Sequence, residues 1–313
     1  MKRYLLFIMF CFLLLPVPAF GAREFAKVGT IGGQFLKIPM GARPVAMGSA
    51  YVSLADDANS VFWNPAGIAR LSRTVLSIHH TQLPAEVGLT AASYVFHVGF
   101  MPGALAVSAR SLHMPEMQIR TVYNPEGTPG YSFDAGDVAF GLTYGRSLTD
   151  KFSTGLTFNY VQSTLYEYTG KAYTFDFGTL YDTGYQSLRI GMVIQNIGSD
   201  MKFIEDVVKM PSVFRVGMSM RLYEGGDYRV LSSAEFNHPP DNNERANWGM
   251  ELGYKDFFYF RGGYNFKYDA EGLALGIGVK IPTSLNSEGA VDYAFVDQGD
   301  LGGVHRISID FRF

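Results

Sequence analysis

The stretch LALGIGVKI, residues 273–281, places a large apolar side chain at every second position. In an extended chain, successive side chains point to opposite faces, so one face of this stretch is wholly apolar. The same period of two recurs in residues 138–144, 214–222 and 248–254. Each of these stretches is therefore predicted to be a β-strand with one apolar face and one face of small or charged residues.

The length of these candidate strands decides the fold class. Strands of soluble β-sandwiches average about five to six residues, whereas about ten residues cross a bilayer at a tilt. Glycines such as Gly191, Gly249 and Gly276 recur on the minority face, as expected for a narrow, filled lumen. About fourteen such segments follow residue 73, an even number that suits a closed bacterial barrel. The sequence predicts an all-β fold: an antiparallel transmembrane β-barrel of about fourteen strands, formed by residues 74–313.

The composition excludes several other classes of protein. The 313 residues are 47% hydrophobic and 18% charged, and 35 of them are glycine. Beyond the N-terminus no apolar run reaches the roughly 18 residues that a spanning helix needs. The net charge of −3 offers no basic surface, so nucleic acid is not an expected partner. The single cysteine, Cys11, excludes a disulfide framework.

Residues 1–21 are predicted to be a secretory signal peptide. Lys2 and Arg3 precede an apolar run, and small residues up to Gly21 suit cleavage after that position. The alternative, an uncleaved anchor, is disfavoured because the run is shorter than the roughly 18 to 20 residues that cross a bilayer. Export of a barrel predicts a location in the bacterial outer membrane.

Short and long connections alternate between the candidate strands. The short ones lie at residues 101–103, 148–150, 183–186 and 224–227, and the longer ones lie at residues 114–133, 199–209, 237–244 and 297–303. In bacterial barrels, short turns face the periplasm and long loops face the exterior. This assignment predicts that both the N-terminal segment and Phe313 lie at the periplasmic end.

The last candidate strand ends on an aromatic residue. Ile307, Ile309, Phe311 and Phe313 share one face, and polar or charged residues share the other. This pattern resembles the C-terminal insertion signal that the barrel-assembly machinery reads in bacterial outer-membrane proteins. The resemblance implies that machinery as a partner during insertion and outer-membrane lipid as the partner afterwards.

Residues 22–73 lack the period of two and are rich in glycine and alanine, which permit close packing inside a lumen. Asp56 or Asp57 is predicted to cap a short helix over residues 58–63 with its carboxylate. Asn64, followed by Pro65, is predicted to cap a second helical turn, because proline is tolerated at the first helical position. The segment is interpreted as a small helical or irregular hatch inside the barrel.

Three runs in this segment carry a family resemblance: GARPVAMGSAY (residues 41–51), ADDANS (residues 55–60) and WNPAG (residues 63–67). They resemble the N-terminal signature of the PorV/PorQ outer-membrane proteins and, more loosely, the hatch of FadL-type transporters of hydrophobic compounds. The resemblance implies a fourteen-stranded barrel whose hatch closes the lumen, held by the segment Asn64-Pro65-Ala66. The hatch motif comprises Gly41, Arg43, Met47, Gly48, Asp56, Asp57, Asn64, Pro65, Ala66 and Gly67.

No residue pattern in the sequence is typical of an active site or a metal site. His79 and His80 are adjacent, so in a strand they point to opposite faces and cannot share a metal ion. His238 and His305 lack an accompanying serine motif. Acidic residues in the last loop, such as Asp297, more often face water than bind calcium. We expect no enzymatic activity, no cofactor and no metal.

Charges of both signs fall on the predicted lumen side of the strands. Burying them unpaired would cost several kcal/mol each, so they are predicted to pair across a narrow interior. The alternative, a selective polar channel, would need a wide lumen lined by one sign of charge. These lumen residues are Asp137, Arg189, Arg215, Arg221, Glu251, Arg261, Lys280, Asp292, Arg306, Asp310 and Arg312.

Two functions follow from the resemblance. PorV-type proteins imply a secretion or surface-assembly component that carries cargo for the type IX secretion system, and this is the first expectation. Tyr123, Tyr131 and Phe133 in the longest loop would then contact secretion-system proteins or cargo, although loop aromatics can equally form a membrane girdle. The alternative is FadL-like passive transport of a hydrophobic ligand, with the hatch moving to open a path.

Overall fold

The computed structural model describes residues 31–127, 131–282 and 287–313. The predicted signal peptide with Cys11, and the first residues of the predicted hatch, 22–30, lie outside these ranges. Within the described ranges, no helix is both long enough and apolar enough to cross a membrane.

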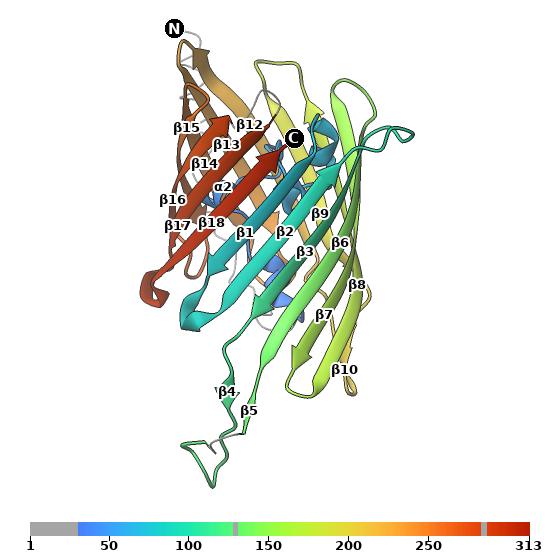
Figure 1. Ribbon diagram of the computed structural model, residues 1–313, viewed down its shortest axis with the longest axis vertical. Coiled ribbons are helices and arrows are strands. Elements are labelled where there is room, and N and C mark those ends of the chain that lie inside the picture. The colour runs from blue at the N-terminus through green and yellow to red at the C-terminus, as the bar shows by residue number, and fades with distance from the viewer. Residues whose placement is uncertain (1–30, 128–130, 283–286) are drawn as a thin grey trace.

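Fourteen antiparallel strands close into a barrel (Figure 1), which confirms the predicted fold class. Consecutive barrel strands are paired, and β1 closes the ring by pairing with β18, from Val75 opposite Arg312 to Gln82 opposite His305. The barrel strands are β1 (Val75–Gln82), β2 (Gly88–Phe96), β3 (Ala104–His113), β6 (Ala135–Ser147), β7 (Phe152–Leu165), β8 (Tyr168–Asp182), β9 (Arg189–Gly198), β12 (Val213–Gly225), β13 (Tyr228–His238), β14 (Arg245–Tyr254), β15 (Phe258–Phe266), β16 (Leu273–Pro282), β17 (Glu288–Asp297) and β18 (Gly303–Arg312).

The two faces of each strand differ as the sequence period requires. In β18, Ile307, Ile309 and Phe311 are 37 to 49% exposed on the outer surface. Arg306 and Asp310 alternate with them and are buried toward the lumen. An outer surface of bare aliphatic and aromatic side chains is unfavourable in water and favourable in hydrocarbon, so this surface is suited to lipid.

The connections form two sets at opposite ends of the barrel. One end, hereafter the short-turn end, holds turns such as the one between β12 and β13, and Phe313 lies there (Figure 1). The other end, the long-loop end, holds the connections from β3 to β6 and from β9 to β12. Two small hairpins are built into these long connections: β4 (Met117–Gln118) with β5 (Ser132–Phe133), and β10 (Met201–Phe203) with β11 (Asp206–Val208). The β4–β5 hairpin, hereafter the arm, projects away from the barrel (Figure 1).

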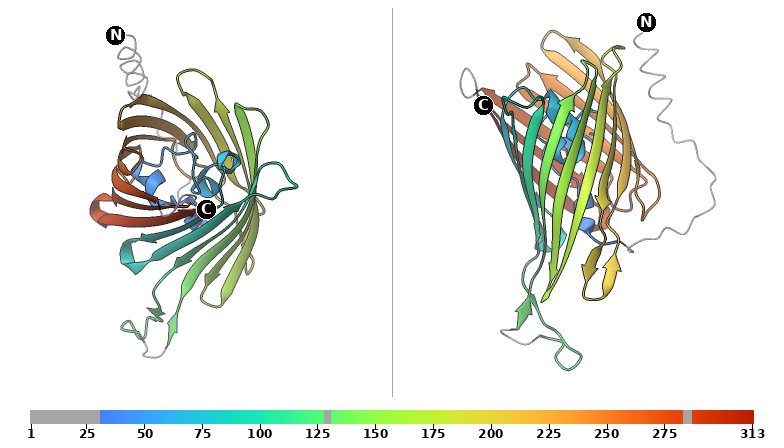
Figure 2. Two further views of the ribbon diagram at one scale, coloured as in Figure 1. Left: turned by 45° about the horizontal axis from the view of Figure 1, so that its top comes forward. Right: turned by 90° about the vertical axis from the view of Figure 1, so that its right-hand side faces the viewer.

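The described residues before β1 lie inside the barrel (Figure 2). This segment, residues 31–73, is hereafter the plug. It contains four short helices: η1 (Gln34–Lys37), α2 (Ala42–Ala46), α3 (Ser60–Trp63) and η2 (Pro65–Arg70). Two further 3-10 turns, η3 (Pro84–Glu86) and η4 (Gly299–Leu301), belong to connections between strands.

The plug starts at the long-loop end, which corrects the predicted placement of the N-terminal segment beside Phe313. Ile31 forms a bridge with Lys209, and Nζ of Lys37 lies 2.7 Å from Oδ2 of Asp241; both partners belong to long connections. These contacts hold the first turn of the plug at that end. The last plug residues, which lead into β1, lie at the short-turn end.

Glycines on the inner wall let the backbones of plug and barrel touch. A Cβ at Gly249 of β14 would lie 2.2 Å from the carbonyl oxygen of Met47, and a Cβ at Gly263 of β15 would lie 2.1 Å from the amide nitrogen of Gly48. A side chain at either position would therefore force the plug away from the wall. These two glycines of the lumen face are contact points for the plug.

Candidate functional site

The first part of the hatch motif forms the turns around α2. Gly41 has a φ of 85°, and a Cβ there would lie 1.9 Å from Oδ1 of Asn59, so glycine is required on both counts. Met47 is fully buried at the end of the helix. Gly48, with a φ of 58°, lies against the backbone of β14 and β15. These residues fix the plug to the wall.

The second part of the motif attaches the plug to β8. The side-chain amide of Asn64 donates to the carbonyl oxygens of Val52 in the plug, at 2.9 Å, and Thr179 in β8, at 3.0 Å. Its Oδ1 accepts from the amide of Ala66 at 3.1 Å, so Asn64 caps η2 and Pro65 occupies the first turn. A Cβ at Gly67 would lie 2.2 Å from the carbonyl oxygen of Ala55. One buried side chain thus serves as helix cap and as link to the barrel.

The two aspartates of the motif have different roles. Oδ1 of Asp57 accepts from the amide of Asn59 at 2.9 Å, just before α3 begins at Ser60. The helix is therefore shorter than the one predicted over residues 58–63. Asp56 makes no such bond and instead pairs with Arg43 at 2.7 Å.

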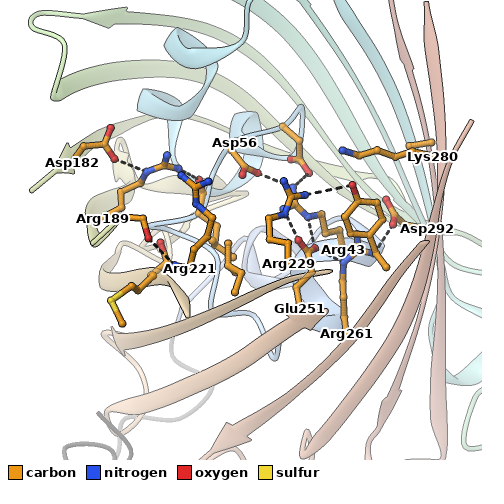
Figure 3. A pocket seen from close by; sticks show the side chains of 18 of the residues that line it. Arg43, Asp56, Asp182, Arg189, Arg221, Arg229, Glu251, Arg261, Lys280 and Asp292 are labelled. Atoms are coloured by element: carbon orange, nitrogen blue, oxygen red, sulfur yellow. Dashed lines mark hydrogen bonds and ion pairs between the residues drawn. The ribbon is translucent and has the colours of Figure 1, made fainter. Parts of the chain in front are cut away.

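Arg43 joins the plug to the barrel wall at the centre of a charged cluster (Figure 3). Its Nη1 donates to Asp56 at 2.7 Å, to Asp57 at 2.9 Å and to the hydroxyl of Tyr51 at 3.0 Å. Its Nε and Nη2 donate to the two carboxylate oxygens of Glu251 in β14, at 2.9 and 3.3 Å. All of the hydrogen-bonding nitrogens of this guanidinium therefore have acceptors.

The cluster continues along the wall through Arg261. Nε of Arg261 donates to Glu251 at 2.7 Å, and its Nη1 donates to Asp292 of β17. Ion pairs thus connect three strands and the plug. We call Arg43, Asp56, Asp57, Glu251, Arg261 and Asp292 the Arg43 network; it borders a polar cavity of about 470 Å³ near the short-turn end.

Within the plug, the Arg43 network sets the ionisation of Asp57. Burial disfavours the charged carboxylate, but the Arg43 guanidinium and hydrogen bonds from Tyr51 and Arg43 outweigh burial and lower the pKa of Asp57. Asp57 is therefore charged at neutral pH. The salt bridge to Arg43 persists across the physiological pH range.

A cluster of apolar side chains fills part of the lumen toward the long loops. Phe35, Leu36 and Met40 of the plug pack with buried wall residues such as Leu89 and Val161. We call this group, with its neighbours, the apolar cluster; it further includes Met47, Tyr51, Leu54, Phe62, Trp63, Ala91, Leu112, Ala139, Ala172, Met201 and Met210. The inner wall around this cluster differs from the charged wall of the Arg43 network, although buried arginines such as Arg306 also lie in this half of the lumen.

The predicted pairing of lumen charges holds for six of the eleven residues named: Arg189, Arg215, Glu251, Arg261, Asp292 and Arg312. Arg189 pairs with Asp182 at 2.9 Å, and Arg312 pairs with Glu288 at 3.4 Å. Five residues depart from the prediction. Within the described chain, Asp137 and Asp310 accept hydrogen bonds from Ser163 and Ser77 and have no ion pair, and Lys280 lies over the ring of Tyr259. Arg221 pairs with Glu224 at the exposed rim, with 45% of its side chain accessible. Arg306 is buried, yet no carboxylate of the described chain lies within 4.0 Å of its guanidinium; it lines a separate cavity described below.

The adjacent histidines point to opposite sides of β1, as the strand geometry requires. His79 is buried between the hydroxyls of Ser77, at 3.0 Å, and Ser308, at 2.8 Å. His80 lies on the outer surface and contacts Thr90 at 3.0 Å. Among the residues described, no group of three potential metal ligands converges.

The aromatic loop residues lie on the arm, far from the lumen. Tyr123 is 98% exposed and Tyr131 is 65% exposed. Phe133 is only half-buried and makes an edge contact with Tyr166 at 6.2 Å between ring centroids. The two tyrosines are accessible, whereas Phe133 helps to fix the base of the arm.

One functional contact was absent from the sequence-based expectations. The carboxylate of Glu235 in β13 accepts the backbone amides of Tyr51 and Val52, both at 2.9 Å, and so binds the middle of the plug. Residues 232–235 are all buried, which hides the period of two in this strand. The signal in the sequence that could have identified this contact is the single charge of Glu235 within a run of small and apolar residues.

The chain matches no protein-family model and no curated protein by sequence. Its fold is similar to that of solved structures. The toluene transporter TbuX of Ralstonia pickettii has a TM-score of 0.60 and 12% identity, over 87% of this chain and 97% of that one. The toluene transporter TodX of P. putida has a TM-score of 0.58 and 10% identity, over 87% and 96% of the two chains. A Pseudomonas aeruginosa FadL homologue has a TM-score of 0.53 and 10% identity, over 88% and 98%. The chain therefore has a FadL-type barrel fold, with the plug in the lumen.

Proposed function

We propose that this protein is a non-enzymatic channel of the bacterial outer membrane for the passive transport of small hydrophobic molecules. The observation that carries the proposal is the apolar cluster inside the lumen, which includes wall residues such as Leu89 and Val161 as well as Phe35 and Leu36 of the plug. A polar solute gains nothing from such a wall. A hydrophobic molecule would gain the same burial that the plug side chains now provide.

The plug is built so that its apolar end is held more weakly than its charged end. Near the long loops, η1 spans only residues 34–37 and is attached through Gln34 and Lys37 to Asp241 and through Ile31 to Lys209. Toward the short-turn end the plug is attached through the Arg43 network and Asn64. A hydrophobic molecule entering from the long loops would therefore displace Phe35 and Leu36 first, and passage would require a further shift of the plug.

The fold similarity supports this function over the secretion role expected first. The alignments with the two toluene transporters cover 87% of this chain and 97 and 96% of those chains, although identities of 12 and 10% carry the fold alone. The PorV/PorQ role in cargo secretion stays a prediction. Its contact residues would be Tyr123 and Tyr131 on the arm, away from the apolar cluster.

The remaining parts of the proposal concern location and assembly. The apolar outer surface would face outer-membrane lipid, with the short turns in the periplasm and the long loops outside. The predicted signal peptide would direct export, and the terminal residues Ile307, Ile309, Phe311 and Phe313 would be read by the barrel-assembly machinery.

A reversible lock on the plug tests the transport proposal. Oγ of Ser53 in the plug lies 3.4 Å from Oγ of Ser233 in β13, so the double variant S53C/S233C places two thiols in contact. The only natural cysteine is Cys11 in the predicted leader, so no other thiol competes after cleavage. The assay is the initial uptake of radiolabelled toluene by Gram-negative cells whose own FadL-type channel is deleted, because their lipopolysaccharide leaflet slows hydrophobic solutes.

We expect wild-type protein to raise uptake above that of cells with an empty vector. Uptake through the oxidised double variant should fall to the empty-vector rate and recover after reduction. The single variant S53C is the control and should be unaffected by oxidant. Equal uptake before and after reduction would refute a moving plug, and wild-type uptake at the empty-vector rate would refute transport of this solute class.

A further inference from the structure

A second cavity, of about 330 Å³, lies between the plug and the wall near the long-loop end. Three arginines from three strands line it: Arg215 of β12, Arg245 of β14 and Arg306 of β18. We call it the arginine cavity. It is separate from the cavity beside the Arg43 network, with which it shares no lining residue.

Arg306 is the least satisfied charge in the described part of the chain. Only 2% of the residue is exposed, and its Nε and Nη1 have no hydrogen-bond partner among the described residues. No carboxylate described in the structure lies within 4.0 Å of it. A buried guanidinium without an acceptor is unfavourable, because it has lost water and gained nothing in return. Such a group is stabilised by an anion that reaches it through the cavity.

The other two arginines are only loosely neutralised. Nη1 of Arg215 lies 3.9 Å from Glu235, beyond hydrogen-bond distance, and that carboxylate is already engaged by the amides of Tyr51 and Val52. Nη2 of Arg245 lies 3.7 Å from Asp269, whose side chain is 85% exposed. The Nε atoms of both arginines are buried without a partner in the described chain. Donors therefore remain free on all three arginines.

The rest of the cavity wall indicates what kind of anion would fit. Ile38, Leu83 and Leu301 line it, and Ile38 and Leu83 also pack against the apolar cluster. Glu271 lines it too, but from the loop after β15 and more than 4.0 Å from Arg306. On the strand side, the cavity has three arginines and one carboxylate, Glu235, and its apolar side continues toward the apolar cluster.

We propose that the arginine cavity binds a compact organic carboxylate, with the carboxylate on Arg306 and its apolar body against Ile38 and Leu83. Guanidinium groups form charge-assisted hydrogen bonds with carboxylates, so the incompletely neutralised arginines match this anion in charge. The inference adds an anionic ligand class to the proposed function. It rests on the proposed function only in assuming that the bound ligand also passes through the barrel. Binding itself requires no transport.

Binding of radiolabelled benzoate to the purified, folded full chain in a non-ionic detergent tests the inference. Toluene, which has the same ring without the carboxylate, is the neutral comparison. We expect wild-type protein to bind benzoate more tightly than toluene. Arg306→Gln should weaken benzoate binding by about tenfold or more and leave toluene binding unchanged, since a charge-assisted hydrogen bond of this kind is lost. Arg306→Lys, which keeps the charge, should restore part of the affinity.

Arg312→Gln is the matched control, because Arg312 lies on the same face of β18 but pairs with Glu288 near the other end. Its benzoate affinity should stay within about twofold of wild type. Should Arg306→Gln fail to fold, Ala270→Trp provides a second test, since Ala270 lies in an exposed loop and its enlargement would occupy part of the cavity without replacing an arginine. Wild-type benzoate affinity in folded Arg306→Gln or in Ala270→Trp would overturn the inference, as would a wild-type protein that does not prefer benzoate to toluene.

Discussion

Arg43 of the plug and Glu251 of the wall form a two-pronged ion pair, with 13% and 3% of their side chains accessible to solvent. The two residues are far apart in the chain, and the second carboxylate contact of Glu251 is to Arg261. Glu251 therefore separates two guanidinium groups that would otherwise face each other. This arrangement makes the carboxylate the most sensitive point of the attachment.

Replacing Glu251 with Gln should destabilise the barrel strongly. The change leaves Arg43 and Arg261 close together without the charge that they share, and breaking a buried pair typically costs about 3 to 5 kcal/mol. The measurement is the free energy of unfolding in urea, with gel migration of heated and unheated samples to follow folding. The double variant Arg43→Gln/Glu251→Gln should recover part of the lost unfolding free energy, and a double-mutant cycle measures this coupling.

The control for that prediction is Glu224→Gln. Arg221 and Glu224 form an ion pair at the rim with 45% and 58% of their side chains accessible, so its loss should cost less than about 1 kcal/mol. Equal losses for Glu224→Gln and Glu251→Gln would contradict a special role of the Arg43 network.

Adding one methyl group at Gly249 should separate plug and wall. The new Cβ would lie 2.2 Å from the carbonyl oxygen of Met47, and backbone on both sides leaves no flexible side chain to yield. We expect Gly249→Ala to lose about 1 to 3 kcal/mol of stability and to make the plug more sensitive to protease. Gly262→Ala is the matched control on the neighbouring strand, because the nearest atom to its Cβ would be a Leu275 methyl at 3.7 Å. The prediction fails if both variants behave alike.

The attachment of η1 should depend on pH through Asp241. Burial opposes ionisation of this carboxyl, but hydrogen bonds from Lys37 and Gln34 outweigh burial and lower its pKa. A lowered folded-state pKa stabilises the attachment above the unfolded value of about 3.9, and this stabilisation is lost as pH falls through the folded value. Exchange protection of the amides of Leu36 and Ile38 should therefore be the same at pH 7 and pH 5 and should fall at more acid pH.

The variant Asp241→Asn is the control for that pH dependence. It removes the charge at every pH, so protection of Leu36 and Ile38 should already be low at pH 7 and should not fall further in acid. A pH-dependent loss of protection that persists in Asp241→Asn would assign the effect to another group.

Replacing Phe313 with Ser should reduce the amount of barrel assembled in the membrane. Phe313 is 60% exposed, and its backbone amide donates to the carbonyl oxygen of Thr74. The substitution keeps this backbone bond and removes only an exposed ring, so it should change the stability of the folded barrel little. A large fall in the assembled fraction in cells, with little change in unfolding free energy of the protein that does fold, would indicate a signal for assembly. Val122→Ser is a matched change at a residue that is 95% exposed on the arm, and it should leave assembly unchanged.

The sequence predicts the barrel well because lipid and lumen impose opposite requirements on alternate residues. In β16 and β18 that period is unbroken, and both strands are found where expected. In β13 the period is masked, because the outward-facing Ser232 and Ala234 lie beneath the large side chain of Trp248 on the neighbouring strand, whose Nε1 donates to Ser232 at 3.1 Å. The inward position of Glu235 was therefore missed.

The site is less predictable than the wall because it is assembled from residues distant in sequence. Arg43 and Asn64 were singled out through the motif resemblance, and the cap by Asn64 follows from local chemistry. Their partners Glu251 and Thr179 are determined by where the plug crosses the barrel, which no local pattern encodes. The direction of the plug escaped prediction for the same reason, since it depends on contacts of Ile31 and Lys37 with the long connections.

The direction of the plug has a consequence for how the chain is topologically arranged. Residues 31–73 enter at one end of the ring and leave at the other to become β1, and the ring is sealed by pairing of the first strand with the last. The chain therefore passes through the lumen of its own barrel. Two assembly routes follow. Either the plug already lies in the lumen when β1 pairs with β18, or the end of the chain before the plug is drawn through the lumen afterwards. In the finished barrel, complete removal of the plug would require pulling that free end through the full length of the lumen.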